Sequence, residues 1–129
     1  MAKTDDMQAQ YEAYPYPERD PARETEKLVI GSPSHPLEID HFLYGGKRDW
    51  SQPFKALVAG GGTGDGLVML AQLLTDWGVD AEVHYLDMSE ASRKIAEARI
   101  AARGLGNVVF HTGDLLTAPD LGSFDYIDC

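Results

Sequence analysis

Apolar residues from Phe54 onward follow the patterns of short buried strands and amphipathic helices. A short apolar run ending in glycine, "FKALVAG", is typical of a strand buried on both faces. After it, Leu67, Leu70, Ala71 and Leu74 recur at helical spacing and predict a helix that Gly78 can cap. The same reasoning predicts strands over 81–88, 107–114 and 124–129, and a second helix over 90–104.

Strand and helix alternate in this order along the chain. This alternation predicts an α/β fold, a Rossmann-like doubly wound sheet that is mainly parallel. In the second helix, which Ser89 can cap, the apolar positions are Ala91, Ile95, Ala98 and Ala102. The crossover over 115–123 is too short for a full helix, so a loop or a single turn is expected there.

The first part of the chain has a different texture. Prolines break any long periodic element before residue 53, and one short helix is expected around Leu37–Leu43. We therefore divide the chain into an irregular N-terminal extension with a short helix, 1–53, and an α/β half-domain, 54–129.

Composition limits the partners of this chain. Its 129 residues carry a net charge of −10, so nucleic acid and anionic membrane surfaces are unlikely partners. The only cysteine is Cys129, the start has no apolar signal-peptide core, and no apolar run spans a membrane. We expect a cytoplasmic protein. The four histidines show no metal-ligand spacing, so no metal is predicted.

The stretch "KALVAGGGTGDG" is dense in glycine and lies where the first strand turns into its helix. Gly60, Gly62 and Gly64 form G-x-G-x-G, which allows a tight turn and close approach of a ligand to backbone N–H groups. No frame fits the dinucleotide pattern G-x-G-x-x-G. A carboxylate at Asp65 would also repel a pyrophosphate. These features favour a ligand that is not a polyphosphate.

Two acids follow the next two strands. Asp87 ends the second strand, where a carboxylate can accept from two ribose hydroxyls, and Asp114 ends the third, where it can accept from an exocyclic amine such as adenine N6. Asp87 can alternatively cap the next helix, and Gly113–Asp114 is also a common turn. Together with the glycines, the two acids indicate an adenosine-containing ligand without phosphates.

This constellation resembles the class I S-adenosylmethionine-dependent methyltransferases, over about residues 54–129. The resemblance rests on "ALVAGGGTG", "VHYLDMS", "NVVFHTGD" and "FDYIDC" in this order. It implies S-adenosylmethionine as the cofactor, held at its methionine end by the glycine loop, at its ribose by the end of the second strand and at its adenine by the end of the third. The implied cofactor-binding residues are Gly60, Gly61, Gly62, Gly64, Asp87, Met88, Asp114 and Leu115.

One position departs from the family pattern. The family usually has an acid two residues before the first loop glycine, often serving the ammonium group of the cofactor, and here that residue is Val58. Asp65 or a main-chain carbonyl is a possible substitute. Asp125 and Asp128, in the last strand, either face the site or mark the ends of the strand.

The resemblance also concerns the ends of the chain. In the family the fourth strand lies beside the first and the sheet usually has seven strands, so we expect a truncated piece that holds the cofactor half, is inactive alone and can self-associate through its open sheet edge. The segment "YEAYPYPERDP" resembles one that precedes the catalytic domain in some bacterial methyltransferases. Its Tyr11, Tyr14 and Tyr16 either cover the site or pack as ordinary aromatics.

The reaction is less clear than the ligand. We expect methyl transfer to an acceptor whose class the sequence does not reveal, and no catalytic residue is assigned. The alternatives are a NAD(P)- or nucleotide-binding oxidoreductase domain, and a non-catalytic module that binds a ligand or a partner.

Overall fold

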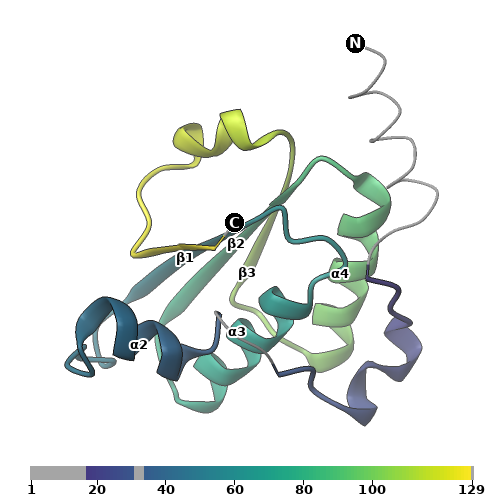
Figure 1. Ribbon diagram of the computed structural model, residues 1–129. Coiled ribbons are helices and arrows are strands. Elements are labelled where there is room, and N and C mark those ends of the chain that lie inside the picture. The colour runs from purple at the N-terminus through teal and green to yellow at the C-terminus, as the bar shows by residue number, and fades with distance from the viewer. Residues whose placement is uncertain (1–16, 31–33, 129) are drawn as a thin grey trace.

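Residues 17–30 and 34–128 are described by the computed structural model, which has a four-stranded parallel sheet at its centre (Figure 1). The strand order is β3-β2-β1-β4, and every neighbouring pair is parallel. The strands are β1 (Phe54–Ala59), β2 (Ala81–Asp87), β3 (Val108–Thr112) and β4 (Tyr126–Asp128). The predicted parallel α/β sheet is confirmed, with β4 beside β1 as the family likeness implies.

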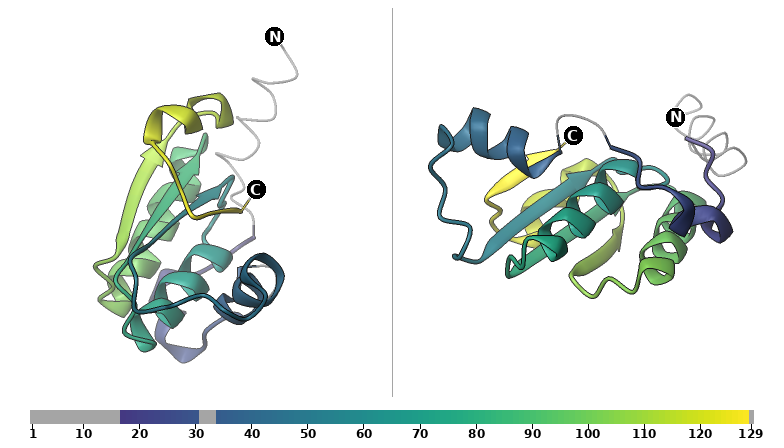
Figure 2. Two further views of the ribbon diagram at one scale, coloured as in Figure 1. Left: turned by 90° about the vertical axis from the view of Figure 1, so that its left-hand side faces the viewer. Right: turned by 90° about the horizontal axis from the view of Figure 1, so that it is seen from below.

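The direction of winding reverses at β1. Helices α3 (Asp65–Asp76) and α4 (Glu90–Arg103) connect β1, β2 and β3 and lie on the same side of the sheet (Figure 2). The chain then crosses to the other side of β1 to form β4, so the sheet is doubly wound with a switch point between β1 and β4. Open α/β sheets bind ligands outside the carboxyl ends of the strands at such a point.

The main core lies between the sheet and α3. Leu67, Val68, Met69, Leu70, Ala71 and Leu74 are buried in this helix, which confirms the predicted stripe. All of them except Met69 belong to one core cluster with β1 and β2 residues such as Ala56, Val58 and Tyr85. Gly78 follows the helix with φ of +70°, a left-handed conformation that favours glycine.

The buried face of α4 differs from the predicted one. Ser92, Ala96, Arg99 and Ile100 are buried in this helix, whereas Ala98 and Ala102, which the apolar pattern favoured, are exposed. The helix is rotated because Arg99 faces inward and its charge is met by Glu24, far away in the sequence. Its ends are as predicted: Ser89 accepts from the N–H of Ser92, and Gly104 adopts the left-handed conformation.

The N-terminal part of the chain contains more structure than one short helix. The predicted helix is α2 (Pro36–Tyr44), which Gly45 ends in the left-handed conformation and whose Ile39 belongs to the main core. A 3-10 helix that the sequence did not indicate, η1 (Pro21–Glu26), packs on α4, and its N-cap Asp20 accepts from the N–H of Ala22. The division of domains at residue 53 stays a prediction.

The opposite face of the sheet has a smaller core. The crossover from β3 to β4 forms a second 3-10 helix of 7 residues, η2 (Leu115–Leu121), which is longer than the predicted loop or single turn. Ala118, Leu121 and Phe124 cover Leu57, Ala59 and Leu86 on this face. The crossover therefore covers this face of the sheet near the carboxyl ends of β1 and β2.

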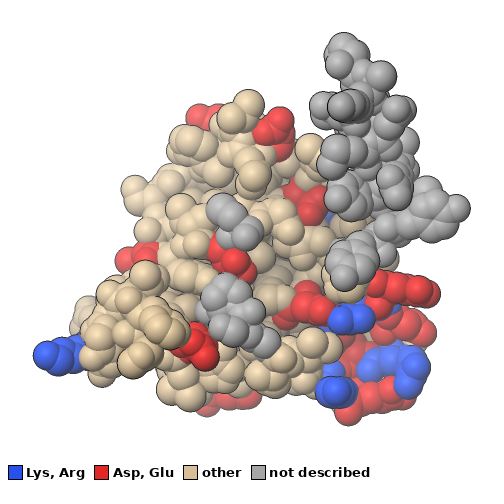
Figure 3. All heavy atoms as spheres, viewed as in Figure 1, with Lys and Arg blue, Asp and Glu red and all other residues tan. Residues whose placement is uncertain are grey.

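Charged side chains are mixed on the face seen in Figure 3. Most of its basic side chains lie next to acidic ones near η1 and α4. Within the described part of the chain, no helix has the length and apolar character that crossing a membrane requires.

Candidate functional site

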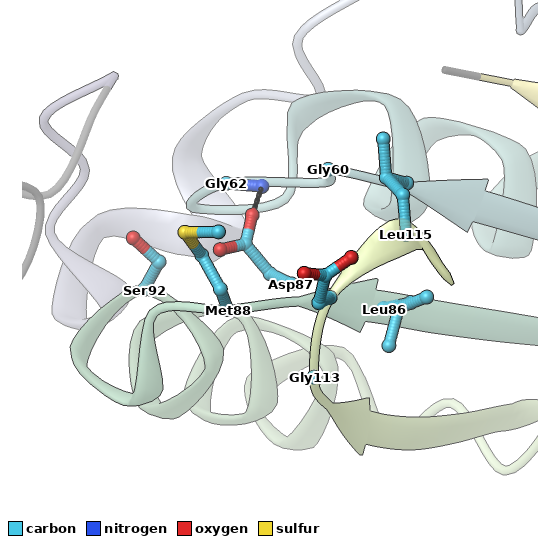
Figure 4. Close-up of a pocket in the computed structure, with 9 residues that line it drawn as sticks. Gly60, Gly62, Leu86, Asp87, Met88, Ser92, Gly113 and Leu115 are labelled. Carbon is cyan, nitrogen blue, oxygen red and sulfur yellow. Dashed lines mark hydrogen bonds between the residues drawn. The ribbon is translucent and has the colours of Figure 1, made fainter. Parts of the chain in front are cut away.

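A cavity of about 330 Å³ opens at the carboxyl ends of β1, β2 and β3 (Figure 4). This is the sheet edge at which the sequence predicted a ligand. Six predicted cofactor-binding residues line it: Gly60, Gly62, Asp87, Met88, Asp114 and Leu115. Leu86, Ser92 and Gly113 complete the lining.

Asp87 joins the end of β2 to the glycine loop. One carboxylate oxygen accepts from the N–H of Gly62 at 2.8 Å and the other accepts from the N–H of Ser89 at 2.8 Å. The carboxylate points from β2 toward Gly62, and Met88 and Leu115 border the same space (Figure 4). A carboxylate accepts about four hydrogen bonds, so both oxygens keep capacity for ligand hydroxyls. The capping and ligand roles of Asp87 are therefore compatible.

The four predicted glycines fall into two pairs. Gly60 and Gly62 line the cavity and have φ of +71° and +56°, which explains glycine at both positions. Gly64 does not line the cavity but also has a positive φ, +103°, whereas glycine at Gly61 is explained by a close contact inside the protein. A Cβ on Gly61 would lie 2.7 Å from the Tyr85 ring, and one on Gly64 would lie 3.1 Å from the Cβ of Ala96. Contact of Gly61 and Gly64 with a ligand stays a prediction.

Tyr85 supports the loop from below. Its side chain is fully buried and its hydroxyl donates to the carbonyl of Gly62 at 2.5 Å. Burial, and then the nearby charge of Asp87, raise the pKa of Tyr85 well above its usual value. The phenol therefore stays a hydrogen-bond donor throughout the physiological range, and it fixes the loop carbonyl while Asp87 fixes the loop N–H.

The carboxylate of Asp65 is occupied by two arginines, which argues against it as the substitute for the acid that is replaced by Val58. Arg19 donates to both of its oxygens, at 2.8 and 2.6 Å, and Arg99 donates to one of them at 2.9 Å. Burial raises the pKa of Asp65, but the hydrogen bonds from these arginines outweigh it and leave the pKa below its usual value. Since two guanidinium groups neutralise this carboxylate, the expected repulsion of a pyrophosphate by Asp65 was wrong. The glycine spacing remains the argument against a dinucleotide.

Arg99 belongs to a set of ion pairs that we call the arginine cluster, formed by Arg19, Arg99 and Arg103 with Glu24 and Asp65. Glu24 accepts from Arg99 and Arg103, each at 2.6 Å, and its side chain is 4% exposed. Arg99 also donates to the carbonyl of Thr63 in the glycine loop at 3.0 Å. The cluster therefore ties the N-terminal segment, α4 and the loop together.

Asp114 lies at the rim of the cavity and is exposed. One of its oxygens accepts from the N–H of Leu116 at 2.7 Å and caps η2. The alternative prediction, that Gly113–Asp114 forms a turn, is therefore confirmed. Binding of adenine by Asp114 and Leu115 stays a prediction.

Sequence reasoning missed Leu86, Ser92 and Gly113. Each is within a few residues of a predicted site residue, and Ser92 is 3% exposed in the first turn of α4. The signal was available, because a helix that follows the second strand must begin at the same edge of the sheet.

The other candidate residues that the structure describes are not among those lining the cavity. His84 and His111 stack with ring centroids 5.1 Å apart on neighbouring strands, and no group of three metal-binding side chains occurs within the described ranges. Asp125 immediately precedes β4, and its carboxylate accepts from the N–H of Lys55 at 2.8 Å, so it marks the start of that strand. Tyr11, Tyr14, Tyr16 and Cys129 lie outside the described residues.

Comparison with known proteins defines the class to which this fold and cavity belong. Residues 56–129 match the family model described as a methyltransferase domain. This range covers more than half of the chain, and the chain belongs to this family, the class I S-adenosylmethionine-dependent methyltransferases.

Individual relatives agree with the family. A demethylmenaquinone methyltransferase from Geobacillus kaustophilus (strain HTA426) is 40% identical over 67 residues, which are 51% of this chain and 27% of the relative. The chain therefore spans about a quarter of that relative's length.

Solved structures share the fold. One, on the conversion of a disulfide bond into a thioacetal group during echinomycin biosynthesis, is 29% identical with a TM-score of 0.57, over 96% of this chain and 46% of that one. A protein-L-isoaspartate O-methyltransferase is 25% identical with a TM-score of 0.51, over 61% of this chain and 24% of that one.

Proposed function

We propose that this domain binds S-adenosylmethionine in the cavity at the carboxyl ends of β1, β2 and β3 and is the cofactor-binding part of a methyltransferase. The observation that carries the proposal is the hydrogen bond from the N–H of Gly62 to Asp87. This hydrogen bond places the glycine backbone, which has no side chain, next to a carboxylate that can accept further hydrogen bonds, and both line the cavity. That pairing suits a ligand with an uncharged sugar next to a compact tail.

The parts of the cavity support different parts of this ligand. The glycine loop receives the methionine end, Asp87 and Met88 receive the ribose, and Asp114 and Leu115 receive the adenine. Leu86 and Gly113 supply the walls between these groups. The buried Ser92 adds a hydroxyl at the start of α4. Matching these parts to the ligand rests on the family likeness together with the lining of the cavity.

The chemistry of methyl transfer belongs to the cofactor, whose sulfonium is already an activated leaving group. The protein's contribution is to hold the nucleophile, methyl carbon and sulfur in line and to exclude water. In this chain, Tyr85 and Asp87 fix the loop from two sides, so the loop is held in place before the ligand arrives. A general base is needed only if the acceptor must lose a proton.

Calorimetric titration with S-adenosylhomocysteine and NAD tests the proposal. We expect S-adenosylhomocysteine to bind and NAD not to bind. Asp87→Ala should weaken binding by about a hundredfold, because a charged hydrogen-bond acceptor and the support of Gly62 are both lost. Asp80→Ala is the matched control, since Asp80 immediately precedes β2 at the opposite end of that strand and should not affect binding. A folded protein that prefers NAD, or equal effects of the two substitutions, would contradict the proposal.

The methyl acceptor and the protein's surroundings are part of the same proposal. We infer an acceptor that is not nucleic acid, because the net charge of −10 opposes a phosphate backbone, and a cytoplasmic location. We also infer self-association through the outer edge of β4, a strand of 3 residues that pairs with β1. Sedimentation at increasing protein concentration tests this association, and a constant monomer mass would exclude it.

A further inference from the structure

Asp128 occupies the switch point of the sheet. It is the last residue of β4, and it lies directly beside Val58 of β1 in the parallel register. β2, which carries Asp87, flanks β1 on the other side. The glycine loop that continues β1 therefore begins between one strand ending in Asp87 and another ending in Asp128.

The Asp128 carboxylate lies next to the first turn of α3. Its Oδ2 would be 3.6 Å from a Cβ placed on Gly66, and it accepts a hydrogen bond from the hydroxyl of Ser34, which is 2% exposed. The strand register explains this position, because residues paired in register on neighbouring parallel strands point to the same face of the sheet. Asp128 thus shares a face with Val58, whose side chain would be 3.3 Å from a Cβ on Gly61 of the loop.

Three carboxylates adjoin the glycine loop within the described ranges, and they differ in what they contact. Asp65 is paired with two arginines, and Asp87 accepts from two backbone N–H groups. Asp128 meets a neutral hydroxyl, and none of the ion pairs found in the described parts of the chain includes it. Asp87 and Asp128 therefore both keep a negative charge near the loop, and Asp128 is the one that lies beside the first turn of α3.

The proposed ligand brings a cation. Its amino-acid tail carries a carboxylate, which suits the N–H groups of the loop and the start of α3, and an ammonium, which requires an anion. We propose that Asp128 binds this ammonium and takes over, from the neighbouring strand, the task of the acid that is replaced by Val58. This inference rests on the proposed function and adds to it the residue that recognises the tail.

A cycle of two ligands and two proteins tests the contact. The ligands are S-adenosylhomocysteine and its deamino analogue, which lacks only the ammonium. The proteins are the full chain and Asp128→Asn, whose amide has the same size and can still accept from Ser34. We expect the full chain to bind the deamino analogue about tenfold or more weakly, and Asp128→Asn to bind both ligands with equal, weak affinity.

Matched variants separate this contact from other effects. Asp125→Asn removes a carboxylate from the residue just before β4, at the end of the strand away from Asp128, and should keep the full preference for the ammonium. Asp128→Ser provides a second neutral side chain in case the amide variant does not fold, with circular dichroism as the check on folding. Both neutral variants at this position should lose the preference.

The outcomes distinguish the inference from the proposed function. If the unmodified chain binds both ligands equally, or if the preference persists in Asp128→Asn, the role of Asp128 is overturned while ligand binding stands. If the unmodified chain is folded and binds neither ligand, the proposed function itself fails and the ammonium contact fails with it.

Discussion

Replacing Arg99 by methionine should destabilise the protein far more than replacing Arg93, an arginine near the surface of the same helix. The guanidinium is 1% exposed and donates to Glu24 at 2.6 Å, to the carbonyl of Thr63 at 3.0 Å and to Asp65 at 2.9 Å. Methionine fills a similar volume, so the loss concerns the polar contacts rather than a cavity. The arginine cluster is the reason that a charged residue is tolerated at this depth.

The magnitude follows from what each partner retains. Breaking a buried ion pair costs about 3–5 kcal/mol because the remaining charge is left buried. Here Glu24 keeps Arg103 and Asp65 keeps Arg19, while the Thr63 carbonyl loses this donor. We therefore expect the lower end of that range, about 3 kcal/mol, in the free energy of unfolding.

Urea unfolding followed by tryptophan fluorescence measures this change. Trp50 and Trp77 are reporters, with ring centroids 5.7 Å apart. For an m-value of about 2 kcal/mol/M, the midpoint should fall by about 1.5 M. Arg93→Met is the control on the same helix, because Arg93 pairs with Glu97 and Glu90 near the surface and should cost less than about 1 kcal/mol. Equal midpoints for the two variants would refute the reasoning.

Three further predictions concern the loop and the dependence of stability on pH. Gly61→Ala should cost about 1–3 kcal/mol because its Cβ would lie 2.7 Å from the Tyr85 ring, whereas Gly106→Ala, with open space around it, should be neutral or slightly stabilising in the same urea assay. The pKa of Asp65 is lowered in the folded protein, so the stability that its ionised form contributes is present above the unfolded pKa of about 3.9 and is lost as the pH falls below that value. The urea midpoint should therefore drop in that pH range, and Asp65→Asn should make the drop smaller. Burial, and then its partner histidine, lower the pKa of His111, so the unfolded chain takes up its proton first and stability should decline as the pH falls below about 6.5. His111→Gln should weaken that decline, and an unchanged pH profile would contradict the assignment.

The elements of this fold were predictable because the apolar runs and the glycines that end them are local signals. The strands, α3, and the caps Ser89 and Gly104 follow from residues within a few positions of each other. The buried face of α4 was not predictable in this way. An arginine can face inward at Arg99 only because Glu24, 75 residues earlier, meets it there.

The same distinction applies to the site. Gly60, Gly62 and Asp87 were identified from their places at the ends of strands, and they line one cavity. The reason for glycine at Gly61 is different, since the Tyr85 ring fills the space that a side chain would need, and at Gly64 a contact with Ala96 adds to the positive φ. Such close contacts between elements are not visible in sequence spacing. The register that sets Asp128 beside Val58 is likewise a property of the assembled sheet.

The arginine cluster also limits how this domain can change during evolution. Glu24 lies in the segment before β1, but the two arginines that it neutralises lie in α4, and one of them holds the loop through Thr63. A recombination breakpoint between Lys27 and Phe54 that joined an unrelated leading segment would remove Glu24 from both guanidinium groups and leave the buried Arg99 with only Asp65 and the Thr63 carbonyl. Chimaeras of homologues should therefore fold only when the segment that carries Glu24 and the helix that carries Arg99 and Arg103 come from the same parent. In saturation mutagenesis, Glu24 should tolerate as few substitutions as the buried residues at the centre of the sheet.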